Sequence, residues 1–224
     1  MDTAGGACSA ALWRKERLIA SRFERLRRGH AERLVPMIEA VMAEGATAYA
    51  DLDCLAVTVG PGGFTGVRIG LATARGLALA CRRPLVGVSN FQVLAAGAKA
   101  DAPSDGSLAV VIDAKRHDLY VQAFASDLRP RTDPASILPQ DLADFLPPGP
   151  LVLVGDGADQ AMPPLATARR RVTLSKAPGA VDAAGLAELV AEEGFGAGEG
   201  MPVEPLYLRP PDATPAKDAA VRRS

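Results

Sequence analysis

Residues 55–82 constrain the fold of this chain more than any other stretch. Leu55 to Val59 form an apolar run typical of a buried strand, and the run stops at Gly60-Pro61-Gly62-Gly63. A helical pattern then begins near Thr65 and continues to about Arg82. A strand, a glycine turn and a helix in this order indicate an α/β fold, and they can direct backbone N–H groups toward a phosphate.

The glycine loop matches neither common nucleotide-binding motif. A P-loop requires a lysine directly after its second glycine, and this loop has none. The dinucleotide motif Gly-x-Gly-x-x-Gly would need a glycine at Thr65, and the acidic residue expected about 20 positions later is missing. Two interpretations stay open: a phosphate site, or glycines that permit tight packing, of which the second is favoured.

Composition excludes several classes of protein. With 48% hydrophobic residues and 224 residues in all, the chain can bury a sizeable core. A net charge of −1 and 4% aromatic residues do not indicate a nucleic-acid-binding surface. Three widely separated cysteines predict neither a disulfide framework nor a zinc site, and they fit a reducing, cytoplasmic location. No apolar run has the ~20 residues of a membrane span.

The hydrophobic pattern predicts alternating β and α segments in two lobes. The expected strands are 8–13, 17–23, 55–59, 85–88, 108–113, 117–125 and 151–154, and the expected helices are 30–44, 65–82, 90–99, a short one at 139–145, and 180–193. The polar stretch 101–107 is the best lobe boundary, which gives lobes 1–101 and 102–209. The proline- and charge-rich residues 210–224 are expected to form a disordered tail.

The glycine loop and the start of its helix resemble a family signature. Residues 60–70, Gly-Pro-Gly-Gly-Phe-Thr-Gly-Val-Arg-Ile-Gly, are similar to the TsaB (YeaZ) signature and depart from it at Gly63 and Val67. Segments 84–89, 112–116, 154–158 and 205–209 also fit this family, in order along nearly the whole chain. The resemblance implies the two-lobed actin/Hsp70-like fold of α/β class.

The same resemblance implies a function and partners. TsaB proteins belong to the bacterial machinery that makes threonylcarbamoyladenosine on tRNA. The chain would then be a non-catalytic subunit that docks on TsaD, with TsaE as a further partner, with tRNA reached through the complex, and with a possible homodimer when alone. The basic residues of the first hairpin and of 169–171 could touch tRNA phosphates, but interleaved glutamates favour a solvated face.

The residues do not indicate catalysis or a metal. The two histidines, His30 and His117, have no second ligand at helical spacing, and no catalytic triad or carboxylate pair stands out. TsaD, the catalytic paralogue, carries a metal-binding His-x-x-x-His, and Asn90 and Leu94 stand at the equivalent positions. We therefore expect no cofactor and no metal. A residual nucleotide cleft stays open as the weaker interpretation, and its candidate residues are Gly60, Gly62, Gly63, Thr65, Gly155 and Gly157.

Small residues recur along the helix that follows the glycine loop, and this pattern suggests either a central core helix or a docking surface. The family resemblance favours docking through this helix and the helix at 30–44. The predicted interface residues are Leu34, Ile38, Val41, Leu71, Ala74 and Ala78.

The N-terminus departs from the family pattern. TsaB proteins usually open with a strand of the type Leu-Ala-Ile-Asp-Thr-Ser, whereas this sequence begins with Met-Asp-Thr-Ala. The hypothesis is a misplaced start or a trimmed chain, which intact-mass measurement of the native protein would test.

The rivals to an assembly subunit are an actin-like ATPase or small-molecule kinase, tested by Mg-ATP turnover, and a homodimer with a separate binding role, tested by sizing.

Overall fold

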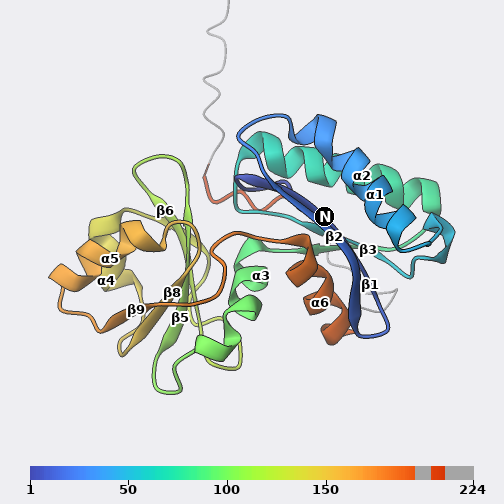
Figure 1. The fold of residues 1–224 in the computed structure, drawn as a ribbon. Helices are drawn as coiled ribbons and strands as arrows, with labels where there is room; N and C mark the ends of the chain where they lie inside the picture. The colour runs from blue at the N-terminus through green and yellow to red at the C-terminus, as the bar shows by residue number, and fades with distance from the viewer. Residues whose placement is uncertain (195–202, 210–224) are drawn as a thin grey trace, which may run out of the picture.

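The chain forms a layered α/β structure around two sheet regions. The computed structural model describes residues 1–194 and 203–209. In Figure 1, helices α1 and α2 cover the outer side of the N-terminal strands, and α4 and α5 cover the outer side of the C-terminal sheet. Helices α3 and α6 lie between the two sheet regions. The mixed α/β class predicted from the sequence is confirmed.

The N-terminal strands form two pairs. β1 (Ala7–Arg14) and β2 (Arg17–Arg25) form an antiparallel hairpin. β3 (Leu55–Thr58) and β4 (Leu85–Val88) pair in parallel. Met1 and Asp2 link the pairs, because Met1 bonds to Ala56 and Thr58 while Asp2 exchanges two backbone hydrogen bonds with Ser9. These two residues therefore occupy the place between β1 and β3 where a central strand would run.

Three helices follow from clear local signals. α1 (His30–Glu44) turns Leu34, Ile38 and Val41 toward the sheet and ends at Gly45. α2 (Phe64–Cys81) begins directly after the glycine loop. α3 (Asn90–Gly97) begins with Ser89 as N-cap, whose hydroxyl accepts the Gln92 N–H.

The C-terminal sheet has five strands in the order β7-β6-β5-β8-β9. Its members are β5 (Ser107–Asp113), β6 (Leu119–Phe124), β7 (Ala135–Ile137), β8 (Leu151–Val154) and β9 (Val172–Leu174), with α4 (Leu142–Phe145) and α5 (Ala158–Thr167) on one face. Short 3-10 helices span Tyr49–Asp51, Lys99–Asp101 and Pro139–Asp141. The sequence pattern did not predict β7, α5 or β9.

Two late segments return to the N-terminal part of the chain. α6 (Ala183–Glu193) packs on β1, and the Ala183 N–H donates to the Ser9 hydroxyl. Residues 203–209 run past the glycine loop, where the Leu206 N–H donates to the Val59 carbonyl. One buried cluster contains residues of β4, α3, β5 and α6, so the core is continuous across the predicted lobe boundary at 101–102. The predicted tail, 210–224, lies outside the described residues.

Candidate functional site

The glycine loop faces the C-terminal sheet across a cleft. A cavity of about 430 Å³ is lined by Pro61 to Phe64, by the β5 end and following turn at 113–116, by Tyr120 and by residues 206–209. The cleft thus brings together three segments that are far apart in sequence.

Close backbone packing explains the glycines of the loop. A Cβ at Gly62 would lie 2.2 Å from the Ala4 carbonyl oxygen, and one at Gly66 would lie 2.1 Å from the Thr3 carbonyl oxygen. The Gly63 N–H already donates to the Ala4 carbonyl at 2.7 Å, so it is not free for a phosphate. Gly60 has a φ of 98°, which favours glycine, and its peptide bond to Pro61 is cis. The packing interpretation of the loop therefore accounts for these residues.

The second glycine pair packs in the same way. A Cβ at Gly155 would lie 2.1 Å from the Val111 carbonyl oxygen, and the Gly157 N–H donates to that same carbonyl. Neither Gly155 nor Gly157 lines the cleft, and Gly60 and Thr65 do not line it either. Of the six predicted nucleotide-binding residues, the structure brings only Gly62 and Gly63 to the cavity.

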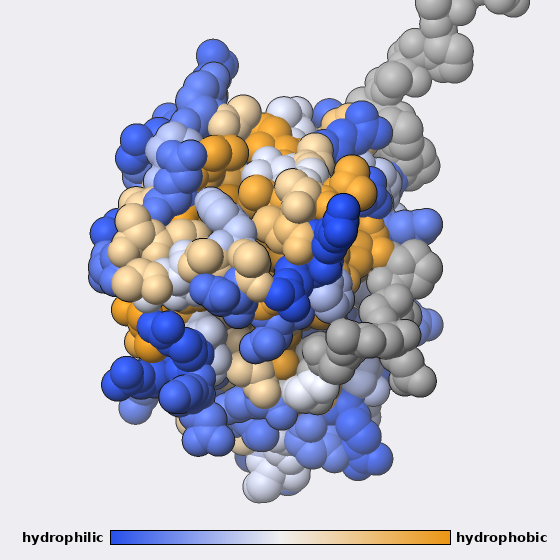
Figure 2. Space-filling view, turned by 90° about the vertical axis from the view of Figure 1, so that its right-hand side faces the viewer, coloured by the Kyte–Doolittle hydropathy of each residue, from blue (hydrophilic) through white to orange (hydrophobic). Residues whose placement is uncertain are grey.

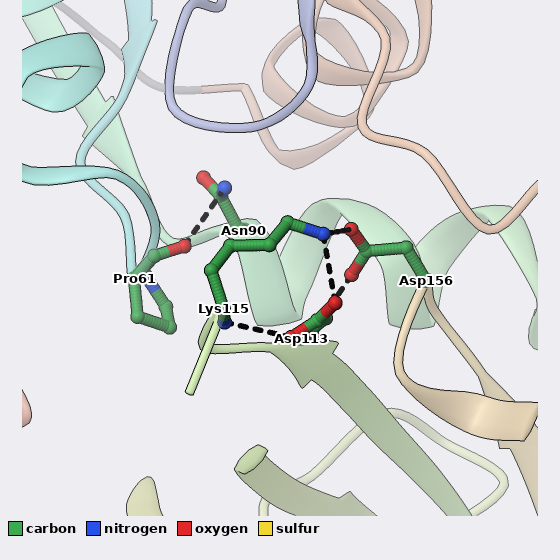
Figure 3. Close-up of polar contacts among 5 residues, drawn as sticks. All are labelled: Pro61, Asn90, Asp113, Lys115 and Asp156. Carbon is green, nitrogen blue, oxygen red and sulfur yellow. Dashed lines mark hydrogen bonds and ion pairs between the residues drawn. The ribbon is translucent and has the colours of Figure 1, made fainter. Parts of the chain in front are cut away.

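A compact charged cluster joins Asp113 and Lys115, which line the cleft, to Asp156 (Figure 3). The Lys115 ammonium lies 2.9 Å from a carboxylate oxygen of Asp113 and 3.4 Å from one of Asp156. The other Asp156 oxygen accepts the Asp113 N–H at 2.9 Å, and the other Asp113 oxygen accepts the Lys115 N–H at 2.7 Å. Each charged side chain in the cluster thus forms an ion pair with another member of the cluster.

The pKa shifts of Asp113 and Lys115 agree with this geometry. Burial opposes ionisation of Asp113, but its hydrogen bonds to Lys115 and the charge of that ammonium lower the pKa of the carboxyl overall. Burial likewise opposes the charge of Lys115, and the two carboxylates nevertheless raise its pKa. A lysine with a raised pKa stays protonated at neutral pH, so it offers no free amine to act as a base or a nucleophile. The cluster is therefore suited to holding the turn in place rather than to proton transfer.

Asn90 and Leu94, which the family resemblance places at the TsaD histidines, serve structural roles in this chain. The Asn90 amide donates to the Pro61 carbonyl at 3.1 Å, and the Asn90 N–H donates to the Gly60 carbonyl at 2.7 Å (Figure 3). Leu94 is buried in the core cluster between the two sheet regions. Within residues 1–194 and 203–209, no three His, Cys, Asp or Glu side chains are grouped so that they could hold a metal ion.

An aromatic contact that the sequence pattern did not predict lines the cleft, between Phe64 and Tyr207. The rings of Phe64 and Tyr207 lie 5.3 Å apart, and the Arg68 guanidinium lies 3.7 Å from the centre of the Phe64 ring. Phe64 and Arg68 sit on the first turns of α2, whereas Tyr207 comes from the returning segment. No local signal connects Tyr207 to α2, because the contact spans 139 residues of sequence between Arg68 and Tyr207.

The predicted interface residues face inward, and this corrects the sequence analysis. Leu34, Ile38, Val41, Leu71, Ala74 and Ala78 are all buried, with exposed fractions of 9% or less. They pack in the clusters beneath α1 and α2, or between α2 and the sheet. The prediction placed the core-facing side of each helix at the docking surface. An apolar pattern alone does not distinguish the side of a helix that faces the core from a side that docks on a partner.

The exposed faces of the same helices carry other apolar residues. Leu79 is 82% exposed and Val35 is 44% exposed. Ala72 and Gly76 are also exposed on α2, and a Cβ at Gly76 would have no neighbour within 4 Å. We call these four residues the outer face. Figure 2 views the molecule from the side of α1 and α2 and shows apolar patches rimmed by hydrophilic residues.

No helix within the described ranges has both the length and the apolar character needed to cross a membrane. The predicted cytoplasmic location stays a prediction.

Comparisons with known proteins identify the family. The family model for TsaD, tRNA N6-adenosine threonylcarbamoyltransferase, matches residues 23–157. The tRNA threonylcarbamoyladenosine biosynthesis protein TsaB of Escherichia coli is 39% identical over 127 residues, which are 57% of this chain and 54% of that protein. The chain thus spans about half the length of this curated relative.

Longer matches cover nearly the whole chain. An uncharacterised protein of Mycobacterium tuberculosis is 32% identical over 217 residues, which are 96% of this chain and 92% of that protein. A Pseudomonas aeruginosa crystal structure, described as an uncharacterised protein with similarity to peptidase YeaZ, is 30% identical with a TM-score of 0.75. That alignment covers 93% of this chain and 97% of the other. On these matches the chain belongs to the TsaB (YeaZ) family.

Proposed function

We propose that this protein is a non-catalytic subunit that docks on TsaD and supports threonylcarbamoyladenosine formation on tRNA. The name of the Escherichia coli relative supports the pathway. The two sheet regions with intervening helices support the two-lobed actin-like form of the fold. Under this proposal TsaE is a further partner, and tRNA is reached through the complex.

The chemistry of the cleft supports a non-catalytic role. Lys115 is held by two carboxylates, and the Asn90 amide and the buried Leu94 occupy the positions that the resemblance assigns to the TsaD metal ligands. An amide tied to Pro61 and a core leucine are not a metal site. The protein would then act on TsaD by contacts that favour one of its conformations.

The outer face of α1 and α2 is the observation that carries the docking proposal. Ala72 and Gly76 allow the backbone of a partner helix to approach closely, and Leu79 presents most of its side chain to a partner. A leucine that is 82% exposed contributes little to the packing of the monomer, so its side chain is free to be buried against a partner.

The test of docking compares two substitutions of exposed leucines. Leu79→Glu places a charge on the outer face, and Leu174→Glu places one on β9, where the leucine is 47% exposed. We expect Leu79→Glu to weaken TsaD binding at least tenfold in a titration, and Leu174→Glu to leave it unchanged, with equal thermal unfolding midpoints. Equal affinities for TsaD would overturn the assignment of this surface.

A further inference from the structure

The first hairpin leaves one strand edge open. β2 pairs with β1 along one side, and no described residue forms a ladder with its other side. β2 is nine residues long, whereas natural proteins often keep exposed edge strands very short, because open edges are templates for pairing. This edge is therefore long enough to accept a further strand.

The hydrogen bonds of Ser9 show which backbone groups of β2 point outward. The Ser9 N–H and carbonyl both bond to Asp2, so they are not available to Phe23, which lies opposite Ser9 on β2. The Phe23 N–H and carbonyl therefore point to the outer edge, and those of Ser21 and Arg25 follow at the two-residue period of a strand. No described backbone group bonds to these three residues on that side.

One side chain covers part of this edge. The Arg22 guanidinium donates to the Ser21 carbonyl at 2.8 Å and to the Glu44 carboxylate at 2.5 Å. The bond to Ser21 is exposed to solvent, so its net contribution is small and the amide of a partner strand can replace it. The backbone groups of Phe23 and Arg25 remain open.

The side chains around this edge form a positive patch. Residues 14–28 contain seven lysines and arginines and two glutamates, although the whole chain has a net charge of −1. Glu24 is already paired with an arginine of α1 at 2.6 Å. Arg25, Arg27 and Arg28 are exposed, and none of them forms an ion pair within the described part of the chain. Uncompensated positive charge of this kind attracts an acidic partner.

An aromatic side chain lies exposed beside these charges. Phe23 is 41% exposed, whereas its cross-strand neighbour Ser9 is fully buried beneath α6, so Phe23 lies at the margin of the covered face. Phe23 and Arg25 are two residues apart and therefore share one face of the strand. A strand added to this edge would place one residue beside Phe23 and another, two positions away, beside Arg25. An apolar residue suits the first position and an acidic residue suits the second.

The open backbone groups favour a peptide over a nucleic acid. Phe23 and Arg25 present carbonyl oxygens as well as N–H groups at the edge, and phosphates can only accept hydrogen bonds. A peptide strand supplies donors and acceptors in alternation. A second copy of this chain is disfavoured, because pairing β2 with itself would bring two positive patches together.

We propose that the outer edge of β2 binds an extended acidic segment of a partner protein by strand addition. An apolar residue of that segment lies against Phe23, and an acidic residue two positions away lies against Arg25. This edge is separate from the outer face of α1 and α2, and the inference does not depend on the proposed function. Because its test uses no TsaD, a failure here would leave the docking test at Leu79 unaffected.

The experiment uses a fluorescent peptide, Glu-Thr-Glu-Thr-Val-Thr-Glu-Thr-Glu, which has the same order of side chains in both directions. It presents Val and Glu on one face at the spacing of Phe23 and Arg25. The control peptide has Lys in place of each Glu. We expect the acidic peptide to bind about tenfold more tightly in anisotropy titrations at low salt, with an affinity that falls as salt is added. Equal affinities, or no binding of the acidic peptide, would overturn the proposal.

A proline variant separates strand addition from charge attraction alone. Ser21→Pro removes an outward N–H and spares the ladder with β1, because edge strands tolerate proline where the nitrogen faces solvent. We expect Ser21→Pro and Arg25→Glu each to weaken binding of the acidic peptide about tenfold. Arg171→Glu makes the same charge change at an exposed arginine before β9 and should leave binding unchanged. Equal binding by Ser21→Pro and the parent chain would contradict strand addition.

Peptides methylated on one backbone nitrogen test the same point without changing the protein. A methyl group on the nitrogen of the central Val blocks the ladder at Phe23, whereas one on the preceding Thr lies on the far edge of the peptide. We expect the first to weaken binding about tenfold and the second to leave it unchanged. An RNA that binds as tightly as the acidic peptide, or a dimer of the parent chain that Ser21→Pro dissociates, would assign this edge to another occupant and overturn the proposal.

Discussion

At the scale of single residues, backbone contacts rather than ligand chemistry explain the glycine signature. Gly62 and Gly66 meet the carbonyl oxygens of Ala4 and Thr3, and Gly70 meets the Thr3 hydroxyl. The sequence predicted a tight turn here and favoured packing over a phosphate site, and the close contacts of Gly62 and Gly66 are of the packing kind. It could not identify the partner, because Thr3 lies 63 residues from Gly66 in the sequence and no local pattern connects them.

Two alanine substitutions in α2 test this account. At Gly66, a Cβ would collide with backbone that cannot move aside, so Gly66→Ala should lower the free energy of unfolding by about 2–3 kcal/mol. At Gly76 nothing lies within 4 Å, so Gly76→Ala should raise it by about 0.5–1 kcal/mol through helix propensity. Urea denaturation of both variants measures the difference, and equal effects would show that the contact at Gly66 is not restrictive.

At the scale of elements, the sequence predicted where helices begin and end better than it predicted which face of each helix is buried. The boundaries of α1 agree with the prediction, and those of α2 agree within one residue at each end. The buried face of α2 was assigned wrongly, because alanines, glycines and leucines surround the helix and give no clear polar side. α5 was missed because Pro163 and Pro164 predict a break, whereas burial of Ala161 and Leu165 in the C-terminal core outweighs that penalty.

The orientation of α2 can be tested by replacing leucine with alanine once on each of its two faces. Leu71 is 3% exposed and Leu79 is 82% exposed, so Leu71→Ala leaves a core cavity and Leu79→Ala does not. We expect the first to lower the free energy of unfolding by about 2–4 kcal/mol and the second by less than about 0.5 kcal/mol. Thermal or chemical denaturation gives both values, and a larger loss at Leu79 would mean that the helix is turned the other way.

At the scale of the whole molecule, late segments hold early ones in place, and this arrangement was not predicted. α6 packs on β1, and residues 203–209 connect both sides of the cleft. On one side the Arg75 guanidinium donates to the Val203 carbonyl at 2.6 Å, and on the other Arg209 pairs with Asp118. The spacing of hydrophobic residues and the presence of turn residues indicate only local structure. Contacts between segments that are far apart in the sequence therefore leave no signal in these patterns.

The ion pair of Arg209 gives a prediction at this scale. Asp118 is buried, and although burial opposes its ionisation, hydrogen bonds to Ser136 and Arg209 lower its pKa overall. Arg209→Ala should cost about 2–4 kcal/mol at neutral pH, because it leaves a buried carboxylate without its cation. Arg129→Ala, which removes an exposed pair with Asp127, should cost less than about 1 kcal/mol.

The pH dependence of the Arg209 effect follows from the lowered pKa. The carboxylate of Asp118 is ionised in the folded chain above that pKa, so its stabilisation is present above the usual value near 4 and is lost as pH falls through the lowered value. Denaturation at pH 7 and pH 3 should therefore show a smaller difference between the parent chain and Arg209→Ala at the lower pH. A difference that grows as the pH falls would contradict the role given to this pair.

Under the proposed function, the protein assists threonylcarbamoyladenosine formation without catalysing it. The most direct measurement is product formation on tRNA in a mixture of the threonylcarbamoyl-adenylate synthase, TsaD, TsaE, ATP, threonine and bicarbonate from one organism, with and without this protein. We expect product when the protein is present with TsaD, no product from the protein without TsaD, and less product with Leu79→Glu. Product that is equal without the protein, or formed by the protein in the absence of TsaD, would contradict it.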